Sequence, residues 1–368
     1  MPPTSAAVSD LLPCPARRHT LRALAALSAL PALPAPAAVA AAGTAYDAAG
    51  PERVEVLDLR WTDASRNRAL PLRLRLPQGA SAAHAATARP LILFSHGLGG
   101  SVDAGTAWAT HWASHGFAVL HLQHPGSDAA VWQDPLRDGA GLLDRARAAR
   151  ELRAAANVEQ FEARVHDVKF VLDELARRQR AGDATARQLD LARIGMSGHS
   201  YGAVTTQALA GQRYSARGTL QARADALAEP RIAAFIAFSP SARGDDPAQQ
   251  FAAITRPFFS VTGTEDGEVG MGLGVKPAQR LLPFALMPAP DKYLLNLDGA
   301  DHAIFSGQPR WRDAERADAD RDALHRRLVQ ATTLAFWQAT LRADAAARQW
   351  LRRDAAALIG TAGSWQAK

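Results

Sequence analysis

Three residues of this sequence have the types and the chain order that nucleophilic catalysis requires. Ser200 lies in the pattern Gly198-His199-Ser200-Tyr201-Gly202, and Asp266 and His302 each follow a short apolar segment further along the chain. A serine hydroxyl is a poor nucleophile until a base takes its proton, and imidazole, with a pKa of about 6.5, can do so near neutral pH. A carboxylate then holds the imidazole in the useful tautomer. We therefore expect Ser200 to be the nucleophile, His302 the base and Asp266 the acid.

The acid has a neighbour that could replace it. Glu265 and Asp266 both follow the segment 257–261, and the shorter side chain of Asp266 beside Gly267 suits a tight loop better. Glu265 is the alternative, and Asp266 could also merely bond its own turn. Among eleven histidines, His302 is the one that follows both Ser200 and such an acid. We expect His96 and His199 to be packed beside the site.

A glycine-rich turn could stabilise the negative charge that develops during attack on a carbonyl group. His96-Gly97-Leu98-Gly99-Gly100 follows directly on the apolar segment 91–95. Such a turn can aim a backbone N–H at an oxyanion, and the residue after the nucleophile supplies a second donor. Most glycine-rich turns have a structural role alone, but the position of this turn before the serine motif favours a role in binding the oxyanion. We expect an oxyanion hole made by Leu98 and Tyr201.

These residues need a scaffold that brings them together. The segment 191–196 is typical of a buried strand and the segment 203–211 of a helix, which places Ser200 on a sharp strand-to-helix turn. A side chain at Gly198 or Gly202 would crowd this turn and hold the helix away from the strand.

Strands and helices alternate along most of the chain. The segments 54–61 and 70–76 alternate apolar and polar residues, which is typical of an antiparallel pair at a sheet edge, and apolar residues in 159–176 lie on one helix face. The alternation predicts an α/β fold with a mostly parallel sheet of about eight strands and helices on both faces. The chain order Ser, Asp, His is that of the α/β-hydrolase fold, which we therefore expect, with His302 on the loop after the last strand. The eight strand segments are 54–61, 70–76, 91–94, 117–120, 191–196, 232–238, 257–261 and 293–297.

The first 42 residues have the features of a signal peptide. A basic stretch that contains Arg17-Arg18 precedes a short apolar region and an Ala-rich cleavage site, and the paired arginines favour the twin-arginine route. A disordered Ala/Pro-rich leader is the alternative. Residues 43–368 are then expected to form a single domain, periplasmic or secreted, with a partly helical insertion at about 124–158. A plain solvated helix there is equally compatible with the sequence.

Charge and cysteine content narrow the classes of function. The net charge is +6, and residues 1–42 carry three arginines and one aspartate, which leaves +4 on the remainder. Basic and acidic residues are mixed, so nucleic-acid binding is not indicated, and no other segment has the ~18 apolar residues needed for stable membrane insertion. The single cysteine, Cys14, lies in the predicted leader, which excludes a cysteine nucleophile. No metal-ligand spacing or phosphate-loop lysine is present, and we expect no cofactor; the oligomeric state is left open.

Taken together, four motifs resemble a known group of enzymes. The segments 94–100, 198–203, 261–266 and 299–302 resemble exported bacterial α/β-hydrolases of the predicted dienelactone hydrolase type. That group is similar to platelet-activating-factor acetylhydrolase and, more distantly, to polyester hydrolases. The resemblance covers most of residues 53–345.

We expect a serine esterase that cleaves carboxylic esters through an acyl-serine intermediate. Trp108, Trp112 and Trp132 follow the turn in the chain and could narrow an acyl pocket, although each could equally be packed in the core. We expect small-molecule esters with short acyl chains, of about two to six carbons, to be preferred. The alternatives are a polyester or lipid-ester hydrolase and a catalytically idle binding protein that keeps the fold.

Overall fold

The structure is a computed structural model of the chain. It describes residues 46–79, 88–136, 141–213, 227–242, 246–267, 274–308 and 316–368, which all belong to one unit, Gly43–Lys368. The predicted signal peptide, with Arg17, Arg18 and Cys14, lies outside the described residues and remains a prediction.

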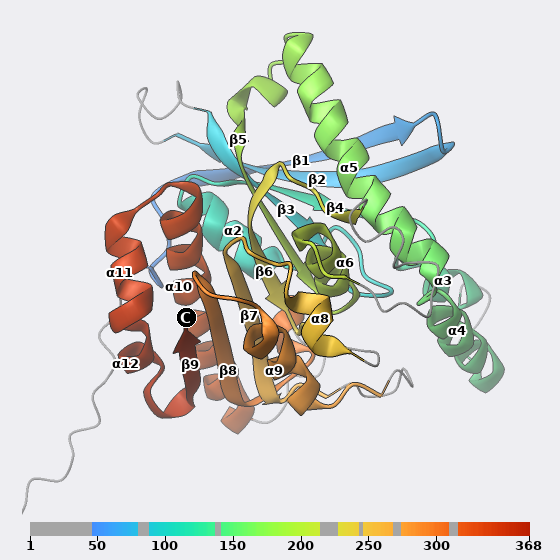
Figure 1. Ribbon diagram of the computed structural model, residues 1–368. Coiled ribbons are helices and arrows are strands. Elements are labelled where there is room, and N and C mark those ends of the chain that lie inside the picture. Colours follow the sequence, from blue (N-terminus) through green and yellow to red (C-terminus); the bar gives the residue numbers. More distant parts are fainter. Residues whose placement is uncertain are drawn as a thin grey trace, which may run out of the picture. The chain divides into compact units, whose positions relative to one another are not determined.

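One mixed sheet of nine strands forms the centre of the fold (Figure 1). The strand order is β1-β2-β4-β3-β5-β6-β7-β8-β9, in which the pairs from β4 to β8 are parallel and the pairs β1–β2, β2–β4 and β8–β9 are antiparallel. The strands are β1 (Arg53–Asp63), β2 (Arg68–Gln78), β3 (Arg89–Ser95), β4 (Ala118–Leu122), β5 (Leu189–His199), β6 (Ile232–Phe238), β7 (Phe258–Glu265), β8 (Lys292–Asp301) and β9 (Gly363–Ala367).

The predicted fold class is confirmed, including the antiparallel pair β1–β2 at one edge. The count of about eight strands missed β9, which pairs antiparallel with β8 and forms the other edge. Trp365 is the only large apolar residue of β9, and its neighbours Ser364 and Gln366 are exposed. Backbone hydrogen bonds rather than apolar burial define this strand, and for that reason it leaves no clear pattern in the sequence.

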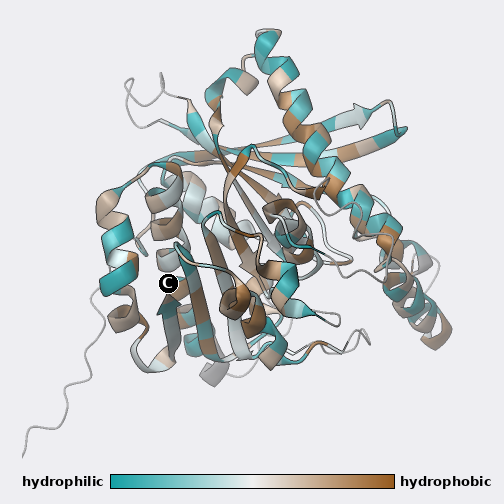
Figure 2. Cartoon of the chain, in the orientation of Figure 1, coloured by the Kyte–Doolittle hydropathy of each residue, from teal (hydrophilic) through white to brown (hydrophobic). Residues whose placement is uncertain are grey.

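Helices cover both faces of the sheet, and each face has its own apolar cluster. One cluster contains Leu91 and Leu93 of β3 and packs against α5 and α6, whereas the other contains Ile92 and Phe94 and packs against α2 and α10. Because both faces of β3 are buried, the strand is a continuous apolar run. Figure 2 shows apolar residues gathered along the central strands. The helices are α2 (Thr106–Ser114), α3 (Ala130–Gln133), α4 (Leu142–Ala154), α5 (Val158–Arg180), α6 (Tyr201–Ala210), α8 (Pro247–Phe251), α9 (Pro277–Leu286), α10 (Arg316–Leu341), α11 (Ala345–Arg353) and α12 (Ala355–Ile359), with 3-10 turns η1 (Asp134–Leu136), η2 (Ala186–Gln188), η4 (Ile304–Ser306) and η5 (Gly360–Ala362).

The segment 124–158, predicted as an insertion, contains α3, η1 and α4 between β4 and α5. Asn157 caps the N-terminus of α5, because its side chain accepts a hydrogen bond from the backbone N–H of Gln160. The apolar stripe of α5 is buried as the spacing predicts. Among the residues that the structure describes, no helix is both long and apolar enough to cross a bilayer.

Candidate active site

The turn around Ser200 is sharp and strained. Ser200 joins the end of β5 to the start of α6 and has a positive φ of 55° with ψ −112°. A Cβ atom on Gly198 would lie 2.3 Å from the carbonyl oxygen of Gly202, and one on Gly202 would lie 2.0 Å from the carbonyl oxygen of Ser95. Both glycines are therefore required for the close approach of α6 to the sheet, as the sequence predicts.

The structure brings Ser200, His302 and Asp266 into one chain of hydrogen bonds. The Ser200 hydroxyl lies 2.9 Å from Nε2 of His302, and Nδ1 of His302 lies 2.7 Å from Oδ1 of Asp266. Asp266 follows β7 and His302 follows β8, so the carboxyl ends of neighbouring parallel strands place them side by side. An imidazole held in this way can take a proton from the hydroxyl.

The geometry distinguishes the two candidate acids. Asp266 is fully buried and faces His302, whereas Glu265 is exposed at the end of β7. The loop that carries His302 follows β8, which is not the last strand as expected, because β9 adds to the sheet beyond it.

The predicted oxyanion turn lies directly beside Ser200. A Cβ atom on Gly97 would lie 3.5 Å from Cβ of Ser200. The turn is held in place because the N–H of Gly99 donates to the carbonyl of Ser127 at 2.9 Å and the N–H of Gly100 donates to the carbonyl of Gly97 at 3.0 Å. Leu98 lies between these anchored residues, and Tyr201 begins α6 on the other side of Ser200.

Comparison with known proteins supports the same fold and a related chemistry. Residues 73–218 match the family model described as platelet-activating factor acetylhydrolase, isoform II. Over these residues the chain is similar to platelet-activating-factor acetylhydrolases, and its fold is that of an α/β-hydrolase. The match includes the predicted oxyanion turn and Ser200 but ends before Asp266 and His302. It supports ester hydrolysis of the serine-hydrolase type. No curated protein sequence matches the chain.

Within the candidate active site, Asp266 has two further partners that the sequence analysis did not identify. The Thr262 hydroxyl donates to Oδ2 of Asp266 at 2.7 Å, and Nε of the buried Arg280 donates to the Asp266 carbonyl at 3.1 Å and lies 3.4 Å from Oδ1. The same guanidinium donates to the carbonyl of Ser239 at 2.7 Å. Arg280 therefore places a fixed positive charge beside the carboxylate. It lies on α9, where no local pattern marks it.

His199 packs against His302, as expected. The two rings lie 4.7 Å apart between centroids, and Nε2 of His199 donates to the carbonyl of His302 at 3.1 Å. Burial lowers the pKa of His199 well below its usual value, and His302 and Arg280 lower it further, so His199 is neutral at pH 7. A neutral His199 can hold the backbone of His302 without adding charge to the site.

The three tryptophans considered for the acyl pocket have different positions. Trp108 and Trp112 of α2 are fully buried and stack on Phe238. These two tryptophans therefore belong to the core and do not narrow an acyl pocket. Trp132 of α3 instead donates from Nε1 to the carbonyl of Gly99 at 2.8 Å. The segment 124–158 therefore packs against the predicted oxyanion turn through this side chain.

A buried polar cluster lies below the same turn, on the side of α5. It consists of Ser95, His96, His124, Arg164 and Asp167, all of which are buried. The sequence singles out His124 only as the residue before Pro125-Gly126 at a strand end, and nothing local marks Arg164 or Asp167. The feature that could have identified Arg164 and Asp167 is their position as charged residues on the otherwise apolar, buried face of α5.

A candidate metal site is not found among the described parts of the chain, where no group of three or more His, Cys, Asp or Glu side chains could hold an ion. The residues brought together here suit acyl transfer by a serine nucleophile.

Proposed function

We propose that this protein hydrolyses carboxylic esters through an acyl-serine intermediate on Ser200. The continuous hydrogen-bond chain from Asp266 through His302 to Ser200, with lengths of 2.7 Å and 2.9 Å, supports the proposal most strongly. The glycine-rich turn beside Ser200 and the family match support it further.

The reaction then proceeds in two halves. Ser200 Oγ attacks the carbonyl carbon of the ester while its proton moves to Nε2 of His302, and the tetrahedral intermediate collapses with release of the alcohol, which takes that proton. Water, activated by His302, cleaves the acyl-serine and releases the acid. The backbone N–H groups of Leu98 and Tyr201 stabilise the oxyanion, each by about 3 to 4 kcal/mol.

We propose that short acyl chains, of about two to six carbons, are preferred. The matching family is named for removal of an acetyl group, which is the shortest of these acyl groups. The turn 96–100 approaches Ser200 closely at Gly97, and Trp132 packs on Gly99 of the same turn. In a short pocket, each CH₂ group that is accommodated contributes ~0.8 kcal/mol to binding, and longer acyl chains are excluded.

One observation favours a lipid ester as the alternative substrate. Leu142 and Leu143, at the start of α4, have exposed fractions of 85% and 84%. The same helix carries Leu152, which lies close to Gly99 of the oxyanion turn. Exposed leucines on a basic helix near the site would suit contact with a lipid aggregate.

A substrate series tests both proposals. We expect kcat/KM to be highest for p-nitrophenyl acetate or butyrate and to fall for octanoate and palmitate. A maximum at palmitate would contradict the short-chain preference.

If lipid aggregates are the substrate, activity on short-chain phospholipids should rise sharply above the critical micelle concentration in the wild type and not in a Leu142→Ser, Leu143→Ser variant. A protein that turns over none of these esters and does not react with a fluorophosphonate would instead be a binding protein with this fold.

A further inference from the structure

The buried cluster below the oxyanion turn contains a second chain of serine, histidine and aspartate. The hydroxyl of Ser95 donates to Nε2 of His124 at 2.9 Å, and Nδ1 of His124 donates to Oδ2 of Asp167 at 3.0 Å. All three side chains are fully buried between the sheet and α5, the helix that carries Asp167, so no ester can reach Ser95. This chain therefore has a role other than nucleophilic attack.

Two arginines outside the cluster, Arg66 and Arg68, compensate the negative charge of Asp167. Burial by itself would raise the pKa of Asp167, but hydrogen bonds from His124 and Arg68 lower it to about 2, and Arg66 donates to it at 2.8 Å. Burial and the nearby Arg164 lower the pKa of His124 to about 4. The contact between His124 and Asp167 is therefore a hydrogen bond from a neutral imidazole at pH 7, not an ion pair.

Arg164 connects this cluster to both sides of the predicted oxyanion hole. Its guanidinium donates to the carbonyl of His96, the first residue of the turn that contains Leu98, and to Oγ of Ser95 at 3.4 Å. Its Cζ also lies 4.6 Å from the centroid of the Tyr201 ring. Arg164 is fully buried, so these contacts are made without competition from water.

We propose that Arg164 is a positioning residue that sets the distance between the two oxyanion donors. It bonds the backbone that leads to Leu98 and packs on the side chain of Tyr201, while the chain Ser95–His124–Asp167 holds the guanidinium in one orientation. This inference rests on the proposed function. Its expected effect is on the transition state, because a shift of about 1 Å in a catalytic group can cost about 100-fold in rate.

The Arg164→Lys variant tests the proposal, since lysine keeps the charge but cannot reach both partners as a planar fork. We expect kcat on p-nitrophenyl acetate to fall about 10- to 100-fold while KM changes less than about 3-fold. Affinity for a trifluoromethyl ketone, which forms a tetrahedral oxyanion on the serine, should fall by a similar factor. Arg178→Lys is the matched control, because Arg178 lies on the same helix and packs over Trp61 away from the site.

Tyr201→Leu gives an independent measurement, because it removes the ring and keeps the backbone N–H. We expect a similar loss in kcat, and less than additive loss when it is combined with Arg164→Lys. If Arg164→Lys does not fold, Tyr201→Leu is compared with Tyr201→Phe, which keeps the ring and loses only the hydroxyl bond to the Asn157 carbonyl. Equal losses in these two variants would then contradict the inference. Unchanged kcat and inhibitor affinity in the variants, beside an active wild type, would overturn this inference and leave the proposed function intact. An inactive wild type would contradict the proposed function itself.

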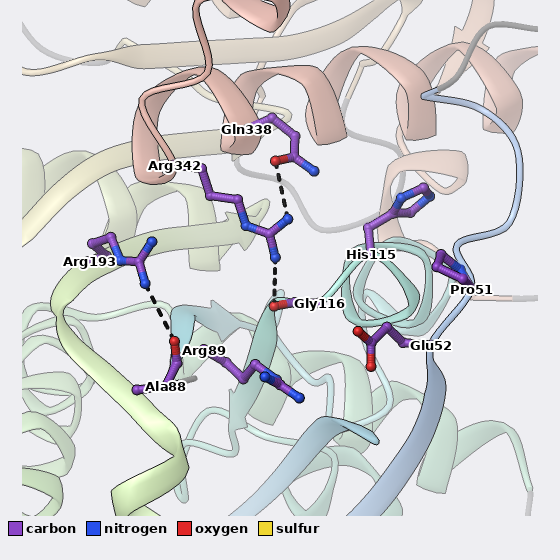
Figure 3. A pocket seen from close by; sticks show the side chains of 9 residues that line it. All are labelled: Pro51, Glu52, Ala88, Arg89, His115, Gly116, Arg193, Gln338 and Arg342. Atoms are coloured by element: carbon purple, nitrogen blue, oxygen red, sulfur yellow. Dashed lines mark hydrogen bonds between the residues drawn. The ribbon is translucent and has the colours of Figure 1, made fainter. Parts of the chain in front are cut away.

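An independent observation concerns the opposite end of the strands, where a hollow of about 400 Å³ contains three arginines (Figure 3). Arg89 begins β3 and Arg193 lies early in β5, whereas the predicted active site follows the other ends of these strands. Arg342 enters from α10. Glu52 is the only carboxylate among the nine residues that line the hollow, which are Pro51, Glu52, Ala88, Arg89, His115, Gly116, Arg193, Gln338 and Arg342.

The guanidinium of Arg342 is held by neutral acceptors. It donates to the carbonyl of Gly116 at 2.9 Å and to Oε1 of Gln338 at 3.3 Å, as Figure 3 shows. Burial lowers the pKa of Arg342, and the nearby charges of Arg193 and Arg89 lower it further. Nε of Arg193 also lies 2.5 Å from Oδ2 of Asp190, so Asp190 and Glu52 compensate part of the charge of the three arginines. The positive charge that remains would stabilise an anion that enters the hollow.

We propose that this hollow binds a small oxyanion of the phosphate class, either free or as a phosphate monoester. At constant ionic strength, inorganic phosphate should raise the melting temperature and give a saturable calorimetric signal, and glycerol 3-phosphate should do so more strongly if an esterified phosphate is the ligand. Arg342→Gln should abolish both effects, whereas Arg147→Gln, a change at an exposed arginine of α4, should not. Equal responses to phosphate and chloride, or an unchanged response in Arg342→Gln, would overturn the proposal.

Discussion

At the residue scale, the side chains of the candidate active site differ in their exposure to water. The side chain of His302 has an exposed fraction of 25%, whereas Asp266 has none. Substrate can therefore approach the imidazole and Ser200, while the carboxylate stays in a dry setting with Thr262 and Arg280 as partners. Electrostatic interactions are stronger in such a setting than in water. Each member can be tested by substitution.

Ser200→Ala should abolish esterase activity and covalent labelling by a fluorophosphonate probe, because only the activated hydroxyl bonds to phosphorus. The thermal unfolding midpoint should change little, since the substitution removes one atom at the surface of the site. Labelling measured on a gel gives the result. A variant that still labels would mean that another serine is the nucleophile.

Asp266→Asn should lower kcat by about 10⁴-fold, because an amide no longer selects the productive tautomer of His302. Glu265→Gln should stay within about 2-fold of the wild type, since Glu265 is exposed and His302 bonds Asp266. Steady-state kinetics on p-nitrophenyl acetate compare the two. The opposite order of effects would make Glu265 the acid.

At the scale of single elements, the junction between β5 and α6 is the most constrained part of the site. Helix α6 approaches the end of β3 so closely that only glycine fits at 202, and the strained Ser200 backbone depends on that contact. The same approach places Tyr201 beside Arg164 of α5. Strain of this kind persists because the surrounding strands and helices hold it.

Gly202→Ala should destabilise the protein by about 1 to 3 kcal/mol and strongly reduce activity, because the new methyl group would meet the Ser95 carbonyl at 2.0 Å. Urea unfolding and esterase activity measure the two effects. Gly267→Ala is the matched control for stability, since its Cβ would find its nearest neighbour at 3.8 Å. Equal stabilities of the two variants would contradict this account of the turn.

At the scale of the whole molecule, several histidines are buried in the neutral form. Burial lowers the pKa of His111 to about 4 and that of His124 to about 4, compared with 6.5 for the free side chain. An unfolded chain therefore binds protons below pH 6.5 that the folded chain does not bind. Stability that is fully present above pH 6.5 is lost as the pH falls from 6.5 towards 4.

We expect the free energy of unfolding to be lower at pH 5.0 than at pH 7.5, by roughly 2 kcal/mol for each such histidine. Urea unfolding at both pH values measures the difference. His111→Gln should reduce the pH dependence, whereas His166→Ala should not, because His166 is exposed. A stability that does not change between the two pH values would refute the prediction.

We also propose export to the periplasm or the medium through residues 1–42. Replacing Arg17 and Arg18 by lysines should block processing if the twin-arginine route is used, and full-length protein should accumulate in the cytoplasm. Fractionation and immunoblotting measure this. Normal processing of the variant would point to the general secretory route, and an unprocessed wild type would contradict the export proposal.

The sequence by itself determined the parts of this protein that depend on local backbone geometry. The strained turn at Ser200 needs Gly198 and Gly202, the buried strands need apolar runs, and the helical stripe of α5 needs a fixed spacing. Each requirement acts within a few residues and therefore leaves a pattern that can be recognised in one sequence. The α/β fold class and the order of Ser200, Asp266 and His302 followed from these patterns.

Only the tertiary structure decided the contacts that depend on strand order and helix docking. It placed Asp266 rather than Glu265 against His302, which is 102 residues from Ser200 in the chain. It also brought Arg164 and Arg280 to the two sides of the site and added β9 to the sheet. Such contacts join distant segments through single side chains or backbone groups, and a single polar residue on a helix has no spacing pattern that reveals its partner.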